Sequence, residues 1–196
     1  AGSFDPITHG HNWMIKQGAL LFDELIVVIA FNPDKKGYFT PEERLAQIQD
    51  QIKAYNNVKI LLVPDRYVAD VAKENNCQYL LRGIRNLQDF EYEKTVERVN
   101  LKINPSLQTI YLTPPVELAE VSSSLVKSLV GFPGWQKLVS TMVSPGVVSG
   151  FLSKMHLGVL KSAWENLAGN DAVSQKWFNK IIQHHSEAHR FYHNTG

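Results

Sequence analysis

The residues best suited to chemistry are concentrated in one short run at the start of the chain. The run Gly2-Ser3-Phe4-Asp5-Pro6-Ile7-Thr8-His9-Gly10-His11 brings together two glycines, two hydroxyl groups and two histidines, and an amphipathic stretch follows it. Glycine allows the backbone to approach a ligand closely, and the N–H groups at a helix N-terminus attract anions. The run therefore predicts a phosphate-binding loop and, with it, nucleotide chemistry. The alternative is a helix entry that carries histidines without using them.

Two arginines and an acidic helix form a second candidate site. Arg82 and Arg85 flank a glycine after an apolar run, where guanidinium groups can bind a phosphate through paired hydrogen bonds. The alternative is that the arginines form ion pairs with Asp89 or Glu91. Glu93 lies in the same acidic stretch, which is typical of a solvated helix face.

Two further segments carry groups that bind phosphate. Lys35 follows an Asn-Pro turn within Asn32-Pro33-Asp34-Lys35-Lys36, where an ammonium group could neutralise phosphate or stay solvated. The run Ser122-Ser123-Ser124 opens a predicted helix, so one hydroxyl should be its N-cap while the others could face phosphates.

These segments are positioned by alternating strands and helices. Strands are predicted by apolar runs of strand length, at Leu25–Phe31, Val58–Val63, Gln78–Leu81 and Thr109–Leu112. Helical patterns lie between and beside them, around residues 12–22, 42–54, 67–75 and 90–103. This βαβ alternation predicts a Rossmann-like α/β fold with a doubly wound parallel sheet. Ligands bind such sheets beyond the carboxyl ends of the strands, where the arginine and lysine segments lie.

The first motif resembles the signature of the nucleotidylyltransferase superfamily. Together with the lysine, arginine and serine segments, and with Asp89-Phe90-Glu91-Tyr92-Glu93, it is similar in order and spacing to the phosphopantetheine adenylyltransferase family over about residues 1–150. That family makes dephospho-coenzyme A from ATP and 4′-phosphopantetheine. The resemblance implies a nucleotidyltransferase of coenzyme A biosynthesis that uses Mg²⁺ with its ATP. It also implies that no protein residue ligates a metal.

The resemblance also implies roles for single residues. It assigns catalysis to His11, Lys35 and Arg82, with His11 as a donor to the α-phosphate. The residues implied to bind ATP are Ser3, Phe4, His11, Gly83, Ile84, Arg85, Glu93, Val121, Ser122, Ser123 and Ser124. Those implied to bind the acceptor are Ser3, Lys35, Val68 and Arg82.

Two segments depart from the family pattern. Leu118-Ala119-Glu120 stands where the family usually has an aromatic-Ser-Phe run, and Glu120 would bring negative charge close to the triphosphate. Pro64-Asp65-Arg66-Tyr67 replaces a small glycine-containing turn in the region that holds the pantetheine arm. Two alternatives therefore stay open. One is adenylyl or cytidylyl transfer to another phosphorylated acceptor, such as a nicotinamide or glycerol derivative. The other is a nucleotide-binding module without catalysis that regulates a fused hydrolase.

Composition narrows the class of protein. The net charge of +1 offers no electrostatic basis for binding nucleic acid or a membrane, and the single cysteine, Cys77, cannot form an internal disulfide. No apolar run reaches the length of a membrane span, so we expect a cytoplasmic protein, and the resemblance implies a homo-oligomer. Because the chain opens on Ala1 directly at the first motif, we expect that a short first strand is missing.

The last part of the chain has a different composition. Five of the seven histidines lie in residues 155–196, which predicts an adenylyltransferase domain over 1–154 and a short all-α C-terminal segment over 155–196. Ser186–Asn194, with its Tyr192-His193-Asn194 run, resembles the entry to phosphohydrolases of the HD superfamily. The chain lacks a second cluster of ligands, so His184, His185 and His189 are interpreted as surface residues rather than a zinc site.

Overall fold

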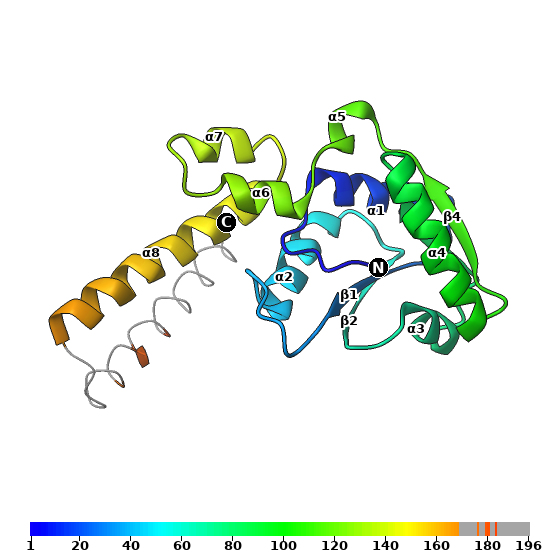
Figure 1. The fold of residues 1–196 in the computed structure, drawn as a ribbon, viewed down its shortest axis with the longest axis horizontal. Helices are drawn as coiled ribbons and strands as arrows, with labels where there is room; N and C mark the ends of the chain where they lie inside the picture. The colour runs from blue at the N-terminus through cyan, green and yellow to red at the C-terminus, as the bar shows by residue number, and fades with distance from the viewer. Residues whose placement is uncertain (169–175, 177–178, 181–182, 184–196) are drawn as a thin grey trace. The chain divides into compact units, whose positions relative to one another are not determined.

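The computed structural model describes residues 1–168, 176, 179–180 and 183. The chain divides into two compact units, residues 1–148 and 149–196. The first unit is an α/β fold and contains all the predicted site residues (Figure 1). The second begins within α8 (Pro145–Ala168), which crosses the division.

The strands form two parallel pairs. In the first pair, β1 (Leu25–Phe31) lies beside β2 (Val58–Pro64), with Leu25 opposite Val58 and Phe31 opposite Pro64. The second pair joins β3 (Tyr79–Gly83) to β4 (Gln108–Leu112). Gly2 extends the first pair through a parallel bridge to Ile29, donating to the Val28 carbonyl at 3.0 Å and accepting from Ala30 N at 2.9 Å.

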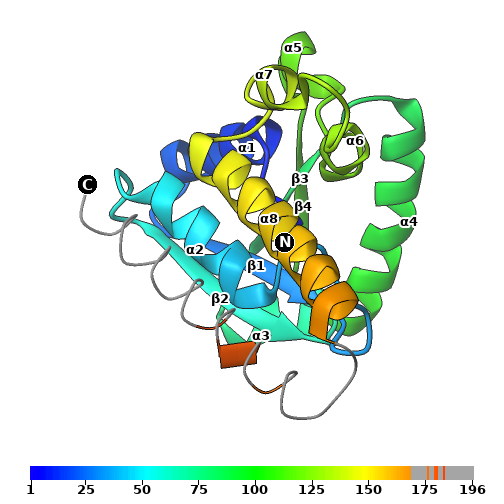
Figure 2. The ribbon, with the colours of Figure 1, turned by 90° about the vertical axis from the view of Figure 1, so that its left-hand side faces the viewer.

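Helices connect and cover these strands. They are α1 (His9–Leu21), α2 (Pro41–Ile52), α3 (Val68–Glu74), α4 (Leu87–Ile103), α5 (Val116–Ala119), α6 (Ser123–Leu129) and α7 (Trp135–Val139). Helix α2 packs on β1 and β2, and α1 packs on β1 and β3. Figure 2 shows α2 beside the first strand pair and α4 beside the second. The ring of Phe90 on α4 meets that of Tyr111 on β4 edge-on, with centroids 5.9 Å apart.

Local sequence explains where these helices begin. Thr40 caps α2, because its hydroxyl accepts from Glu43 N while the Glu43 carboxylate accepts from Thr40 N, and Pro41 occupies the first turn. Asn86 caps α4 by accepting from Asp89 N at 2.8 Å. Ser122 caps α6 by accepting from Leu125 N at 3.1 Å, as the serine run predicts.

The core of the first unit is aliphatic and aromatic. Its fully buried side chains include Ile7, Ile29, Phe39, Ile48 and Val126. A separate cluster joins Val28, Val63 and Val71, so α3 is anchored to the first strand pair. These contacts pack together the elements from which the site loops emerge.

The predicted strands and helices are confirmed, with ends that shift by a few residues. A further helix, α8, begins at Pro145. The four strands form two hydrogen-bonded pairs, and the strands within each pair are parallel. Within the described residues, no helix is long and apolar enough to cross a membrane. The Tyr192-His193-Asn194 run and His184, His185 and His189 lie outside the described residues.

Candidate active site

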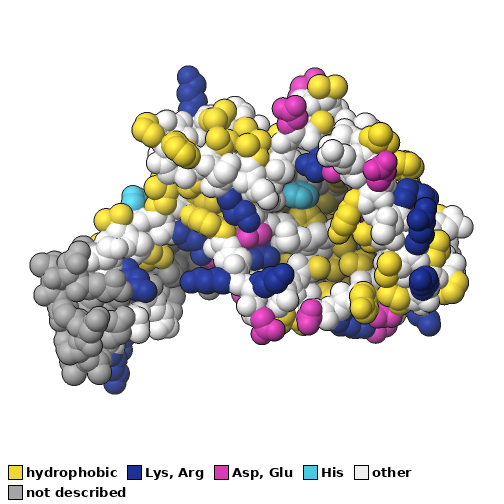
Figure 3. Space-filling view, viewed as in Figure 1, with side chains coloured by type: hydrophobic (Ala, Val, Ile, Leu, Met, Phe, Trp, Pro, Cys, Tyr) yellow, Lys and Arg dark blue, Asp and Glu magenta, His cyan; other side chains and the backbone are white. Residues whose placement is uncertain are grey.

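A cavity of about 840 Å³ lies in the first unit where the predicted site residues meet. Figure 3 shows it as a hollow with hydrophobic side chains on its walls and a histidine at its edge. Its walls come from the first loop, α1, the strands β1 and β3, the start of α4 and the start of α6. The predicted residues that line it are Ser3, Phe4, His11, Arg82, Gly83, Arg85, Glu93, Val121, Ser122, Ser123 and Ser124. This volume is within the range of small-molecule sites.

His11 is fixed at the cavity wall by the first turn of α1. Thr8 is the N-cap of this helix, and its backbone N–H donates to Nδ1 of His11 at 3.1 Å. The Thr8 hydroxyl in turn accepts from His11 N at 3.4 Å. Because Nδ1 accepts a hydrogen bond, the neutral imidazole carries its proton on Nε2. His11 can therefore offer one N–H donor to a ligand.

The surroundings of His11 keep its ring neutral. Burial is the main cause that lowers the pKa of His11 to about 4, and the positive charge of Arg85 contributes to this value. The Phe4 ring packs against the imidazole with centroids 4.9 Å apart. Phe4 itself has a φ of 48°, in the left-handed region that bulky residues rarely adopt. At neutral pH, His11 is thus a neutral hydrogen-bond donor rather than a cation.

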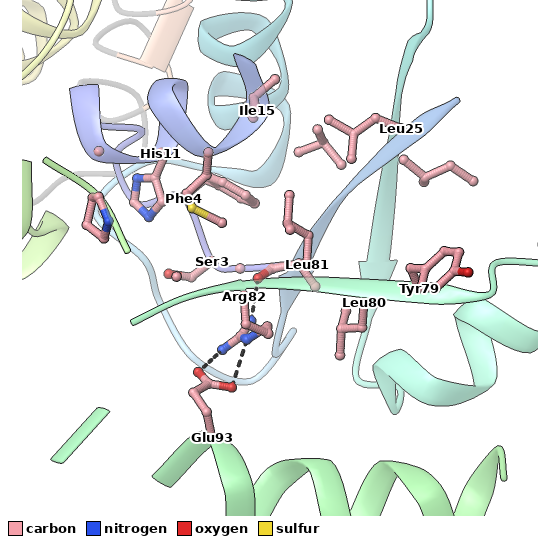
Figure 4. Close-up of a pocket in the computed structure, with 18 of the residues that line it drawn as sticks. Ser3, Phe4, His11, Ile15, Leu25, Tyr79, Leu80, Leu81, Arg82 and Glu93 are labelled. Atoms are coloured by element: carbon pink, nitrogen blue, oxygen red, sulfur yellow. Dashed lines mark hydrogen bonds and ion pairs between the residues drawn. The ribbon is translucent and has the colours of Figure 1, made fainter. Parts of the chain in front are cut away.

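Arg82 and Glu93 form a bidentate ion pair at the end of β3. Arg82 Nε donates to Glu93 Oε2 at 2.9 Å, and Nη2 donates to Oε1 at 2.5 Å (Figure 4). Arg82 Nη1 also donates to the Ala1 carbonyl at 2.9 Å. Glu93 is buried, with 7% of the residue exposed, so its carboxylate is not on a solvated helix face as the acidic pattern suggested.

Arg85 forms the ion pair that the alternative interpretation expected. Its Nε donates to Asp89 Oδ2 at 2.7 Å, and its Nη2 donates to Oδ1 at 3.1 Å. The carboxylate of Asp89 raises the pKa of Arg85, chiefly by hydrogen bonding. Both residues line the cavity, and Arg85 is exposed, so a phosphate could reach its guanidinium group.

The three serines of the run make different contacts. Ser122 is occupied as the N-cap of α6, and Ser123 Oγ donates to the Pro6 carbonyl at 2.7 Å. Ser124 is exposed at the cavity wall. The run thus fastens α6 to the first loop and also presents a hydroxyl to the cavity.

Three of the predicted residues lie outside the described lining of the cavity. Lys35 is exposed in the turn after β1, where its N–H donates to the Asn32 carbonyl at 3.1 Å. Val68 begins α3 and lines a separate cavity of about 40 Å³. Ile84 continues β3, with its N–H donating to the Leu112 carbonyl at 2.9 Å.

The Glu120 hypothesis is not supported by the position of this residue. Glu120 is the C-cap of α5, is exposed, and lies outside the described lining of the cavity. The neighbouring residues Leu118 and Val121 line the cavity instead.

Arg44 and Asp5 form a buried ion pair beside the site that sequence reasoning missed. Arg44 lies on α2 but is buried, with 5% exposed. Its Nε lies 3.5 Å from Asp5 Oδ1. The only available signals were that Asp5 lies within the first motif and that Arg44 carries the opposite charge, and their separation along the chain gave no sign of contact.

Comparison with known proteins agrees with this geometry. The cytidylyltransferase-like family matches residues 1–129. A phosphopantetheine adenylyltransferase of Neisseria meningitidis serogroup C is 42% identical over 154 residues, which cover 79% of this chain and 91% of the relative. The chain belongs to the phosphopantetheine adenylyltransferase family.

Other relatives and a solved structure support the family and its fold. Phosphopantetheine adenylyltransferases of Chromobacterium violaceum and Streptococcus agalactiae serotype Ia are 39% and 37% identical, covering 78% and 67% of this chain and 93% and 81% of the relatives. The structure of Plasmodium falciparum nicotinic acid mononucleotide adenylyltransferase complexed with NaAD superposes with a TM-score of 0.54. It is 20% identical and covers 80% of this chain and 94% of that one, so it shows the nucleotidyltransferase fold alone.

Proposed function

We propose that this chain transfers the adenylyl group of ATP to 4′-phosphopantetheine, giving dephospho-coenzyme A and pyrophosphate. One observation carries the proposal: His11, Ser3, Arg82 and the serine run line one cavity in a member of the phosphopantetheine adenylyltransferase family. Its size suits two small substrates lying end to end.

The reaction needs alignment and charge stabilisation rather than a protein nucleophile. An oxygen of the acceptor phosphate attacks the α-phosphorus of ATP, and the bond to the bridging oxygen of the β-phosphate breaks as pyrophosphate leaves. Negative charge develops on the non-bridging oxygens. In the proposal, the Nε2–H of His11 donates to one of them. A neutral donor already fixed by Thr8 requires no reorganisation as the charge develops.

The acceptor would be held mainly by Arg82. A guanidinium group has five N–H donors, and Glu93 and the Ala1 carbonyl together take three of them. Two N–H groups remain for the acceptor phosphate. Ser3 and Lys35 would add contacts to that phosphate, and Val68 a contact to the pantetheine arm, as the family resemblance suggests.

ATP would occupy the other side of the cavity. Its proposed contacts are Ser3, Phe4, His11, Gly83, Ile84, Arg85, Glu93, Val121, Ser122, Ser123 and Ser124. Arg85 is accessible for this role, whereas the Glu93 carboxylate is already occupied by Arg82. Glu93 stays a proposed ATP-side residue because it lines the cavity, but its carboxylate is bonded to Arg82 and is not free to accept from the nucleotide.

At this site Mg²⁺ would be held by the phosphate oxygens of ATP rather than by protein side chains. Within the described residues, no group of three histidine, cysteine, aspartate or glutamate side chains is placed to hold a metal ion. Mg²⁺ prefers phosphate oxygens and water when a protein supplies few carboxylates. When bound, it would neutralise charge on the triphosphate, and no residue of the chain is assigned to it.

Pyrophosphate release tests the proposed reaction. The protein is incubated with ATP or CTP and with 4′-phosphopantetheine, nicotinic acid mononucleotide or glycerol 3-phosphate. We expect release with ATP and 4′-phosphopantetheine only. Faster release with another acceptor would replace the substrate assignment, and ATP binding without release under any condition would favour a non-catalytic nucleotide-binding module.

We further propose that residues 155–196 begin a separate HD-type domain, based on the Tyr192-His193-Asn194 run. A catalytic metal site needs ligands from several helices, so this part of the chain should bind Zn²⁺ or Mn²⁺ only weakly. Calorimetric titration tests this, with His193→Ala as the comparison. Tight stoichiometric binding lost in that variant would contradict it.

We also propose that the protein is a cytoplasmic, homo-oligomeric enzyme. Light scattering tests its oligomeric state.

A further inference from the structure

Outside the cavity lining, the carboxylate of Asp5 joins three segments of the first unit. Oδ1 accepts from Phe39 N at 2.8 Å, and Oδ2 accepts from Tyr38 N at 2.9 Å. Lys127 Nζ on α6 donates to Oδ2 at 3.1 Å. Asp5 is buried, with 6% exposed, and lies two residues after Ser3. The carboxylate therefore connects the first loop, the turn that contains Lys35, and α6.

Arg44 also connects the first loop to the turn that contains Lys35. Its Nε donates to the Phe39 carbonyl at 2.8 Å, and its Nη1 donates to the Ser3 carbonyl at 3.2 Å. The guanidinium group lies so close to Gly37 that a Cβ atom there would be 1.7 Å from Nη2. The absence of a side chain at Gly37 thus allows Arg44 to reach both loops.

The charges of this cluster compensate one another. Burial alone would raise the pKa of Asp5, but the backbone donors of Phe39 and Tyr38, with Lys127 and Arg44, lower it below the usual value. Asp5 therefore stays ionised at neutral pH. An ionised carboxylate accepts short hydrogen bonds from two neighbouring N–H groups more strongly than a neutral side chain does.

We propose that Asp5 and Arg44 are positioning residues for the transfer reaction. They connect Ser3 and the Lys35 turn, which both carry proposed acceptor contacts, to α6 and its serine run on the nucleotide side. Ser123 supports the same link by donating to the Pro6 carbonyl at 2.7 Å. In-line transfer depends on the distance between acceptor oxygen and α-phosphorus, so a small displacement of either loop slows the chemical step. This inference rests on the proposed function.

Kinetics of three variants test the positioning role. Asp5→Asn keeps the size of the side chain but removes its charge, and Arg44→Lys keeps a charge but loses the fork that reaches two carbonyls. Gly37→Ala leaves both residues intact and displaces the guanidinium group. We expect kcat to fall about 10- to 100-fold in each variant, while the Kd for ATP changes less than about threefold. The matched control is Asp50→Asn, on the exposed face of α2, which should keep wild-type kcat.

Amide hydrogen exchange separates positioning from general loss of structure. In the folded variants, exchange should rise in residues 2–8 and 32–40 but not in β2. Wild-type kcat with unchanged exchange in folded Asp5→Asn and Gly37→Ala would overturn the proposal, as would a kcat loss explained entirely by weaker ATP binding. If the wild-type protein releases no pyrophosphate, the proposed function fails. The positioning role is then judged by exchange, and unchanged rates in either loop overturn it.

Discussion

The guanidinium group of Arg82 at the end of β3 is clamped by the carboxylate of Glu93 on α4, through bonds of 2.9 Å and 2.5 Å. The side chain of Glu93 is 9% exposed and that of Arg82 is 28% exposed, so the acid is the more buried partner. This pair fixes the direction of the guanidinium group at the cavity wall. Removing Arg82 would also leave the buried charge of Glu93 without its ion-pair partner.

The first prediction concerns the substrate that Arg82 holds. Arg82→Ala should raise the KM for the phosphopantetheine acceptor more than the KM for ATP, because the guanidinium group lies on the proposed acceptor side. Arg82→Lys should restore the function only in part, since one ammonium group cannot reproduce the fork. Steady-state kinetics with each substrate varied in turn measures the effect. An equal rise in both KM values would give Arg82 a structural role instead.

The second prediction separates two roles for Glu93. Glu93→Gln keeps the shape of the side chain but weakens two charge-assisted hydrogen bonds to Arg82, which should lower the free energy of unfolding by about 2 kcal/mol. If Glu93 acts through Arg82, the KM for the acceptor should rise as it does in Arg82→Lys. Denaturant unfolding and the same kinetics provide both values. A rise in the KM for ATP alone would instead indicate direct contact with the nucleotide.

The third prediction concerns His11 as a transition-state donor. His11→Ala should lower kcat at least ~100-fold with a modest change in KM, because the donor acts on charge that develops only during transfer. His9→Ala is the matched control, since His9 lies on the same helix outside the described cavity lining and should keep its turnover. Near wild-type turnover in His11→Ala would refute the assignment.

The fourth prediction follows from the pKa of His11, which is lowered from 6.5 to about 4 in the folded protein. The unfolded state binds a proton as the pH falls below 6.5, while the folded state resists it until about pH 4. The free energy of unfolding should therefore be fully retained above pH 6.5 and decrease as the pH falls toward 4. Denaturant unfolding across this range, compared with His11→Gln, measures the contribution. A difference between the two proteins that is independent of pH would contradict it.

The fifth prediction concerns Glu120, which is exposed at the end of α5. Solvent screens an exposed charge, so Glu120→Gln should leave the KM for ATP within about twofold of the wild-type value. Lowering the salt concentration should not enlarge the effect. A clearly tighter binding of ATP in Glu120→Gln would show that the carboxylate faces the triphosphate after all.

Local signals in the sequence were sufficient to predict the helices and strands and most of the residues of the cavity wall. The β-branched run at β1, the Thr-Pro start of α2 and the serine cap of α6 are each encoded within a few residues, so they could be predicted without knowing the fold. Because the strands of each pair are parallel, their carboxyl ends lie at the same edge of that pair. The loop after β1 is hydrogen-bonded to Asp5 of the first motif, and the loop after β3 shares the cavity with this motif.

The partners of the charged side chains were decided by the tertiary structure. Nothing local indicates that Arg82 pairs with Glu93 rather than Glu91, or that Arg44 is buried against Asp5, which lies 39 positions earlier. The proton position on His11 likewise depends on the cap geometry of Thr8. The sequence by itself determined the parallel α/β fold, the family and the residue types of the site. Only folding decided which charges meet and which are buried, because ion pairing depends on distances between segments that the order of residues does not contain.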